Sequence, residues 1–248
     1  MKAKRSQRET GTGSTADSAS SSRNSLLAAL SGAALRRFSS EAEAVDLVFG
    51  QVLYEPGMRK RHVYFPTSCY ISQIASLSST PRIEVGLVGA EGMVGSSLLF
   101  GIDVAPLLTV VQGAGSAVRL DGARFIHELA RGPRLRAVIN RYLYVRLTQL
   151  GQMTACTRFH TVDQRMARWL LMTRDRAHAD TFFLTHEYLA YMLGVRRVGV
   201  TEAATSLQDR KLIRYSRGTI TILDGHELEG ASCECYATAE RVYARFMN

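Results

Sequence analysis

Residues 185–202 read THEYLAYMLGVRRVGVTE, and this stretch predicts two short helices that meet at a glycine. Its first residues, His186 and Glu187, also begin the motif of zinc proteases. In that motif a second histidine stands four residues after the first, so that both can hold one metal ion on the same helix face. Alanine occupies that position here, at Ala190. The motif is incomplete, and the zinc-protease interpretation is excluded.

The same residues fit a helix-turn-helix. Thr185 is a suitable N-cap for the first helix, and Gly194 supplies the turn that ends it. A second helix is expected over roughly 196–211, with Val200, Ala203, Ala204 and Leu207 on its inner side. Residues 213–224, IRYSRGTITILD, then predict a two-stranded hairpin that turns at 216–218. Together these elements predict a winged helix-turn-helix.

The charge of this segment favours duplex DNA as its partner. Residues 196–217 carry six basic and two acidic side chains, whereas residues 224–240 carry five acidic and no basic ones. Arginine can donate two hydrogen bonds to a guanine edge, and a carboxylate can accept one from cytosine. A wing arginine and a helix N-terminus suit phosphates. The predicted DNA contacts are therefore Thr185, Arg196, Arg197, Thr201, Glu202 and Arg217. An amphipathic helical hairpin with a solvated basic face is the alternative.

A long helix is expected before this domain. Apolar residues recur at helical spacing over about 20 residues. They form two stripes, the first being Leu135, Val138, Tyr142 and Val145, and the second Ile139, Leu143, Leu147 and Leu150. One stripe can lie on the preceding domain, while the other needs a partner. The simplest partner is the same helix of a second copy, which predicts a homodimer; burial within one chain is the alternative.

A capping box marks the start of the C-terminal domain. Thr161 and Gln164 have the spacing at which each side chain can bond the backbone of the other. The helix that they open is expected over 162–176, with Met166, Trp169, Leu170 and Thr173 on one face. We therefore place the domain boundary near residue 160.

The N-terminal half has a β texture between residues 46 and 120. Short apolar runs are separated by Gly, Pro and Ser at intervals of about 8–12 residues, which predicts a sandwich, jelly roll or barrel. Residues 1–24 are rich in Ser, Thr and charge and predict a disordered arm. Our domain assignment extends this arm over residues 1–40.

The chain has 248 residues and a formal net charge of +9, within an ordinary globular composition. It carries four cysteines without a secreted framework, has no signal peptide and has no apolar run that could span a membrane, so we expect a cytoplasmic protein with reduced thiols.

Residues 184–222 carry a resemblance to the Crp/Fnr family of bacterial transcription regulators, which extends over about 45–248. The resemblance implies an α+β fold with a jelly-roll-like β-roll at 41–130 (the cyclic-nucleotide-binding type), a dimerisation helix at 131–160 and a winged helix at 161–248. It also implies near-palindromic promoter sites, with RNA polymerase as a candidate partner. In this alignment Arg197 matches a base-reading arginine, whereas Val198 and Glu202 stand where the family has glutamate and a second arginine. The promoter sequence is therefore expected to differ from the best-known site of the family.

The resemblance also places an effector pocket at residues 93–110. Gly95 matches the glycine of the phosphate-binding cassette, but Ser96 replaces its glutamate, and Pro106 and Leu107 replace its arginine and serine. Loss of the guanidinium removes a bidentate contact with phosphate. We expect no response to cyclic AMP and predict no cofactor, leaving open an unidentified small-molecule effector.

The remaining motifs give no further chemistry. No nucleophile–base arrangement predicts an enzyme. Cys233 and Cys235 lie in a stretch expected to be helical from Glu227 onward, where two residues apart point to different sides, so no metal site is predicted. His62, His127 and His160 are expected to lack ligand partners. The alternative function is a cyclic-nucleotide or redox sensor that regulates a partner protein without binding DNA.

Overall fold

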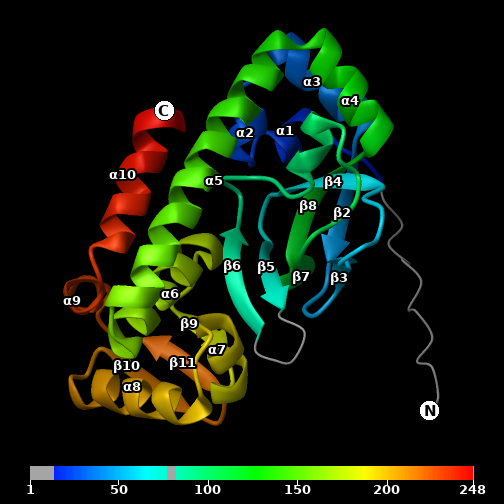
Figure 1. Cartoon of the computed structure of the whole chain (residues 1–248). Coiled ribbons are helices and arrows are strands. Elements are labelled where there is room, and N and C mark those ends of the chain that lie inside the picture. The colour runs from blue at the N-terminus through cyan, green and yellow to red at the C-terminus, as the bar shows by residue number, and fades with distance from the viewer. Residues whose placement is uncertain (1–13, 77–81, 248) are drawn as a thin grey trace.

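The computed structural model describes residues 14–76 and 82–247. A β-rich N-terminal domain and a mainly helical C-terminal domain are joined by one long helix, α5, as Figure 1 shows. The predicted α+β class is confirmed.

Two four-stranded sheets form the N-terminal β-roll. One has the order β1-β2-β8-β4, and the other has the order β3-β7-β5-β6, with every pairing antiparallel. Apolar side chains from both sheets meet between them, among them Val45, Tyr64, Ile71 and Val111. The strand bounds are β1 Ser14–Thr15, β2 Glu43–Leu47, β3 Val52–Tyr54, β4 His62–Pro66, β5 Tyr70–Ser76, β6 Arg82–Val88, β7 Leu108–Gly113 and β8 Gly115–Asp121.

Short helices cover the outer face of the first sheet. They are α1 Ser18–Ser21, α2 Ser25–Ala28, α3 Gly32–Glu41 and α4 Gly122–Arg131, and a 3₁₀ turn, η1, spans Ser96–Phe100. Phe38 of α3 and Phe125 of α4 are fully buried and both pack on Phe65 of β4. This layer joins the roll to α5 through one continuous apolar cluster.

The predicted disordered arm is wrong for residues 14–40. Leu26 and Leu27 are fully buried, and Asn24 caps α2 while its side-chain amide donates to the carbonyl oxygens of Pro66 and Gly92. Apolar residues that follow residue 24 bury enough surface to offset the cost of ordering this segment. Residues 1–13 of the expected arm lie outside the described residues.

The long helix α5 spans Pro133–Phe159, 27 residues against the predicted 20 or so. The first predicted stripe, Leu135 to Val145, is entirely buried against the roll and its helical cover. In the second stripe Ile139 is buried, but the side chains of Leu147 and Leu150 are 68% and 40% exposed. The half of α5 nearer the C-terminal domain thus keeps an apolar side that the other described residues, 14–76 and 82–247, leave exposed.

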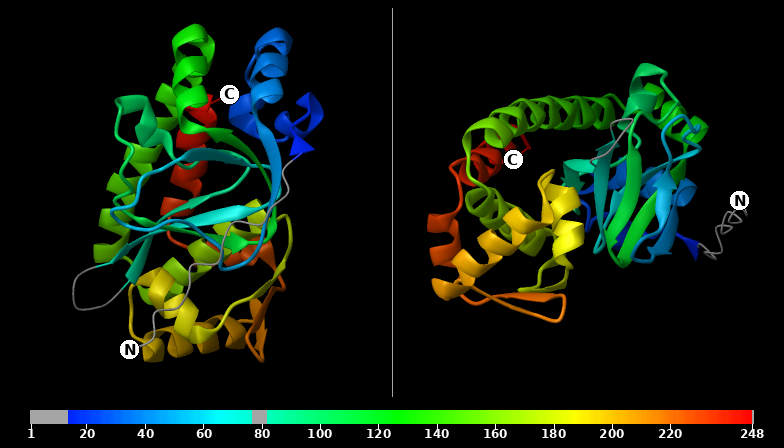
Figure 2. Two further views of the ribbon diagram at one scale, coloured as in Figure 1. Left: turned by 90° about the vertical axis from the view of Figure 1, so that its right-hand side faces the viewer. Right: turned by 60° about the horizontal axis from the view of Figure 1, so that its bottom comes forward.

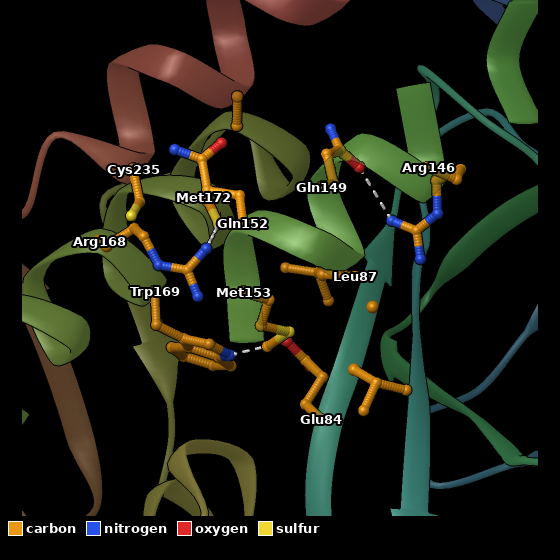
Figure 3. Close-up of a pocket in the computed structure, with 13 residues that line it drawn as sticks. Glu84, Leu87, Arg146, Gln149, Gln152, Met153, Arg168, Trp169, Met172 and Cys235 are labelled. Atoms are coloured by element: carbon orange, nitrogen blue, oxygen red, sulfur yellow. Dashed lines mark hydrogen bonds between the residues drawn. The ribbon is translucent and has the colours of Figure 1, made fainter. Parts of the chain in front are cut away.

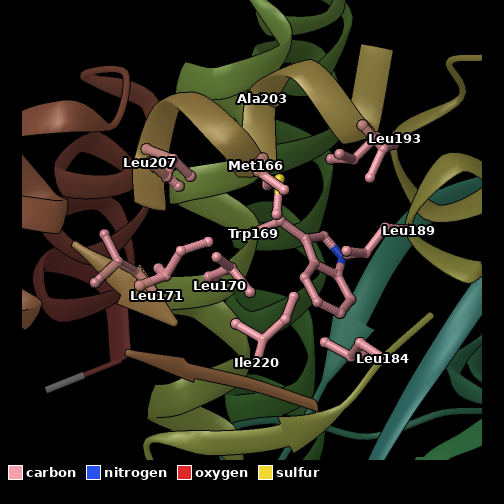
Figure 4. Close-up of a cluster of buried hydrophobic side chains, with 14 of the residues drawn as sticks. Met166, Trp169, Leu170, Leu171, Leu184, Leu189, Leu193, Ala203, Leu207 and Ile220 are labelled. Atoms are coloured by element: carbon pink, nitrogen blue, oxygen red, sulfur yellow. The ribbon is translucent and has the colours of Figure 1, made fainter. Parts of the chain in front are cut away.

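The elements that follow α5 begin with α6 at Val162. They are α6 Val162–Ala177, β9 Thr181–Phe183, α7 His186–Leu193, α8 Arg197–Asp209, β10 Ile213–Ser216, β11 Thr219–Ile222, α9 Gly225–Ala231 and α10 Cys235–Met247. The capping box of Thr161 and Gln164 is present at the start of α6. The predicted inner face of α6 is buried with Leu189, Leu193, Ala203 and Leu207 in the core drawn in Figure 4.

The last helix, α10, returns along α5 toward the N-terminal domain, as Figures 1 and 2 both show. The Phe246 ring packs edge-on against Tyr144 of α5 at 4.8 Å, and the Tyr243 hydroxyl donates to the carbonyl oxygen of Glu91 at 2.8 Å. Among residues 14–76 and 82–247, no helix combines the length and the apolar character that crossing a bilayer would require.

Candidate DNA-binding surface and effector pocket

The first helix of the predicted helix-turn-helix begins and ends as expected. The Thr185 side chain accepts a hydrogen bond from the backbone N–H of Tyr188, which caps the N-terminus of α7. Gly194 ends the helix with a left-handed φ of 63°, a conformation that glycine adopts without steric cost. Arg196 then provides the extended N-cap of α8. The two helices meet at the predicted turn.

The second helix, α8, separates an apolar side from a polar one. Val200, Ala203, Ala204 and Leu207 are buried against the domain core. The opposite side is exposed, and it carries Arg197, Val198, Thr201, Glu202 and Thr205. Val198 is 66% exposed although it is apolar. The residues with predicted base contacts therefore share one exposed face at the N-terminal half of α8.

The wing is larger than predicted. β10 and β11 pair antiparallel from Ile213 with Ile222 to Ser216 with Thr219, and β9 adds a third strand to this sheet. Arg217 and Gly218 form the turn with positive φ values of 49° and 81°. The arginine is exposed at the tip of the hairpin. The third strand lies upstream of the quoted stretch, which is why the hairpin signal missed it.

Basic side chains on this surface are not neutralised by carboxylates. In the part of the chain that the structure describes, no salt bridge involves the basic residues of the segment 196–217, which are Arg196, Arg197, Arg210, Lys211, Arg214 and Arg217. Their charges are consequently free to meet an external anion.

His186 connects three elements of the domain. Its Nδ1 lies 3.0 Å from the Thr201 hydroxyl of α8, and its ring stacks on Tyr215 of the wing at 4.3 Å between centroids. Burial lowers the pKa of His186, and the charge of Arg197 lowers it further. His186 thus joins α8 to the wing through these two contacts, which the sequence did not indicate.

The helix-turn-helix domain packs on strand β6 of the β-roll. The Trp169 indole donates to the Glu84 carboxylate at 3.0 Å, and the Ser72 hydroxyl donates to the other carboxylate oxygen at 2.6 Å. Glu84 is buried, and burial raises its pKa while these two hydrogen bonds oppose the increase. The contact borders a cavity between β6, α5, α6 and α10, shown in Figure 3.

A second contact fixes the turn itself. A Cβ atom added at Gly194 would lie 2.8 Å from the Ile83 side chain of β6, so glycine permits the close approach as well as the backbone conformation. The Arg165 guanidinium of α6 donates to the carbonyl oxygen of Leu193 just before the turn. The turn between α7 and α8 therefore packs directly on strand β6 of the β-roll.

The four residues predicted to line the effector pocket come together. Gly95, Ser96, Pro106 and Leu107 all border one cavity of about 90 Å³. Lys60 also lines the cavity, and the sequence had given no signal for it. Its ammonium donates to the Ser97 hydroxyl and to the carbonyl oxygen of Val104, both at 2.6 Å. Burial lowers the pKa of Lys60.

A group of potential metal ligands lies where none was predicted. The ligand atoms of Cys156, His160, Cys233 and Cys235 all fall within 4.8 Å of one another. The prediction that Cys233 and Cys235 point apart on one helix is wrong, because the chain leaves α9 at Ser232 and starts α10 at Cys235. The expectation that His160 lacks a ligand partner is wrong as well. Cys156 and His160 stand four residues apart at the end of α5. Side chains at this spacing lie on one helix face, so the sequence did contain a signal for this pair.

Comparison with known proteins identifies the C-terminal domain. Residues 164–231 match the model of the Crp-like helix-turn-helix domain. No curated protein matches the chain.

Solved structures match the whole architecture. A protein assigned to the Crp/Fnr family of transcriptional regulators, from Eubacterium rectale, has a TM-score of 0.66 at 18% identity, covering 83% of this chain and 96% of that one. The c-di-GMP-responsive global regulator CLP of Xanthomonas campestris has a TM-score of 0.65 at 18% identity, covering 78% and 100%. FixK2 of Bradyrhizobium japonicum has a TM-score of 0.65 at 14% identity, covering 77% and 98%. At these identities the matches establish the fold.

Proposed function

Because residues 164–231 form a Crp-like helix-turn-helix domain in a chain with the Crp/Fnr regulator fold, we propose that this protein is a sequence-specific transcription regulator that binds promoter DNA as a homodimer. The main observation that supports this proposal is the exposed face of α8. It presents Arg197, Thr201 and Glu202 beside unpaired basic residues, on a helix whose other side is buried. A solvated surface helix would not need such a concentration of unpaired cations next to a hairpin wing.

Each predicted contact has a role in this proposal. Arg197 and Glu202 would contact base edges in the major groove, with Arg196, Val198 and Thr201 beside them. The exposed Val198 side chain suits a thymine methyl group. Arg217 at the wing tip and the N-terminus of α7 at Thr185 would hold phosphates, which fix the position on the duplex without reading its sequence.

The exposed side of α5 supports the homodimer. Leu147 and Leu150 lie one helical turn apart and stay exposed beside α10. Burying them against the same helix of a second copy would remove apolar surface from water. A two-fold dimer would present two α8 helices to successive major grooves about 34 Å apart, which requires a near-palindromic site.

The effector pocket supports a signal other than cyclic AMP. Pro106 and Leu107 provide no guanidinium for a cyclic phosphate, and Lys60 is engaged by Ser97 and Val104 inside a small cavity. One matching structure is described as c-di-GMP-responsive. Any test of effector response should therefore include c-di-GMP.

Selection of duplexes from a random pool by the full-length protein tests the proposal. We expect enrichment of an inverted repeat with half-sites one helical turn apart, unchanged by cyclic AMP or cyclic GMP; a parallel arm contains c-di-GMP. Binding should weaken steeply with salt, because phosphate contacts release counterions. A pool that remains random at low salt would contradict DNA reading and favour the alternative of a sensor that acts on a partner protein.

A further inference from the structure

Four side chains from three segments converge at the junction between α5 and the C-terminal domain. Cys156 lies in the last turn of α5, and His160 follows the end of that helix. Cys233 lies in the link between α9 and α10, and Cys235 begins α10. The three cysteines form a buried cluster of their own, with 1–4% of each residue exposed.

The distances match those of a single tetrahedral ion. The Sγ atoms of Cys156 and Cys233 are 3.6 Å apart, and the Sγ of Cys235 is 3.6 Å from Nδ1 of His160. Tetrahedral zinc with bonds of about 2.3 Å to sulfur and 2.0 Å to nitrogen places two sulfurs about 3.8 Å apart and sulfur and nitrogen about 3.5 Å apart. Two of the six donor distances therefore fit tetrahedral zinc, and the other four do not exceed 4.8 Å.

The surroundings of His160 fit a metal ligand. Nδ1 faces the cysteines, while Nε2 lies 3.2 Å from the Glu234 carboxylate. A carboxylate that accepts from the outer ring nitrogen is the usual support of a histidine bound to zinc, because it fixes the tautomer and the ring orientation. Glu234 stands between the two cysteines of the link, so the same short loop supplies two thiols and the support.

A partly buried cation nearby would balance the charge. Three thiolates and one Zn²⁺ leave a net charge of −1 on a Cys₃His site. Arg168 of α6 lines the cavity that Cys235 also lines, and both are drawn in Figure 3. Its Nε is buried and has no hydrogen-bond partner among residues 14–76 and 82–247. The positive charge of this guanidinium would favour an anionic cluster.

We propose that Cys156, His160, Cys233 and Cys235 bind one Zn²⁺ ion. Three thiolates and an imidazole are the donors that zinc prefers in closed structural sites. An iron–sulfur cluster would place several irons and sulfides between the thiolates, which requires wider spacing than these donors have. Loading releases the protons of the thiols and ties the α9–α10 link to the end of α5.

Metal analysis of the full-length protein, purified under reducing and chelator-free conditions, tests the site. Elemental analysis by mass spectrometry should find about one zinc ion per chain, as a closed four-ligand site requires. After replacement with Co²⁺, the spectrum should show the d–d bands of tetrahedral cobalt and charge transfer from thiolate. Hydrogen exchange at residues 156–161 and 232–236 should accelerate when zinc is withdrawn.

Matched variants locate the ion. Cys235→Ala should abolish zinc retention, whereas Cys69→Ala removes an equally buried thiol from the β-roll core and should leave it unchanged. Glu234→Gln should weaken zinc binding about 10- to 100-fold, as the loss of a supporting carboxylate does elsewhere.

Three results would overturn the proposal. They are metal-free protein that also fails to bind Co²⁺, stoichiometric iron in place of zinc, or a disulfide between Cys156 and Cys233 in freshly isolated protein. The wild-type measurements need no variant, so a misfolded variant leaves the conclusion intact.

Discussion

Trp169 of the helix-turn-helix domain donates a hydrogen bond to Glu84 of the β-roll, over 3.0 Å between the indole nitrogen and the carboxylate oxygen. Glu84 is 2% exposed, and Ser72 donates to its second oxygen. A buried carboxylate that links two domains makes their attachment dependent on its charge. Trp169 is the only tryptophan of the chain, so its fluorescence reports on this contact directly.

Glu84 makes unfolding depend on pH in a predictable direction. Burial raises its pKa above the ordinary value of 4.5, so the folded protein binds this proton more tightly than the unfolded chain. Stability from this group is therefore full at low pH and is lost as pH rises from 4.5 through the raised pKa. In Glu84→Gln this loss should disappear, so the stability of the variant relative to wild type should increase across that window.

Urea denaturation followed by Trp169 fluorescence at a series of pH values measures this difference. The exposed Glu55 provides the control, and Glu55→Gln should follow the wild-type curve. Parallel curves of stability against pH for Glu84→Gln and wild type would show that burial does not raise the pKa of Glu84.

Arg197→Ala should weaken binding to the selected site by about 1–3 kcal/mol, or roughly 5- to 150-fold, and relax preference at one base pair of each half-site. The reason is the loss of two hydrogen bonds to a base edge. Competition binding at fixed salt measures both effects. Arg136→Ala, on an exposed turn of α5, is the control and should change neither affinity nor preference.

Arg217→Ala should act differently from Arg197→Ala. Its exposed position at the wing tip suits a phosphate contact, so affinity should fall by a similar factor on every sequence. The slope of log affinity against log salt concentration should become less steep by about one. A change in sequence preference with an unchanged salt slope would assign Arg217 to base readout instead.

Leu147→Asp should dissociate the homodimer. Leu147 is 68% exposed in the single chain, so the substitution costs the monomer little, but it would place a charge in the proposed helix–helix contact. Sedimentation equilibrium should show a monomer with an unchanged helical content. Val48→Asp, at an equally exposed apolar residue of the β-roll, should stay dimeric. A dimer that survives Leu147→Asp would place the interface elsewhere.

Local sequence signals predicted the helices and the turn of the helix-turn-helix domain. Thr185, Gly194 and the capping box at Thr161 act within one or two helical turns of the chain, so their patterns are complete in a short window. The two stripes of α5 also followed from spacing alone. By contrast, the order of residues 14–40 depends on Leu26, Leu27 and Phe38 meeting a sheet that forms much later in the chain.

The metal-ligand group was missed for a related reason. Cys156 and His160 are helical neighbours, but Cys233 and Cys235 reach them only because α10 folds back along α5. Lys60 likewise enters the effector pocket through its contacts with Ser97 and Val104, more than thirty residues away. Sequence spacing carries no information on such encounters between distant segments.

The return of α10 has a mechanical consequence. A body attached at one point can swing in any direction, whereas a body attached at two points can only turn about the line between them. The C-terminal domain is attached at the end of α5 and again where Tyr243 and Phe246 meet Glu91 and Tyr144. The hydrogen bond between Trp169 and Glu84 adds a further attachment. If that hydrogen bond were broken, the first two attachments would restrict the domain to turning about the line between them.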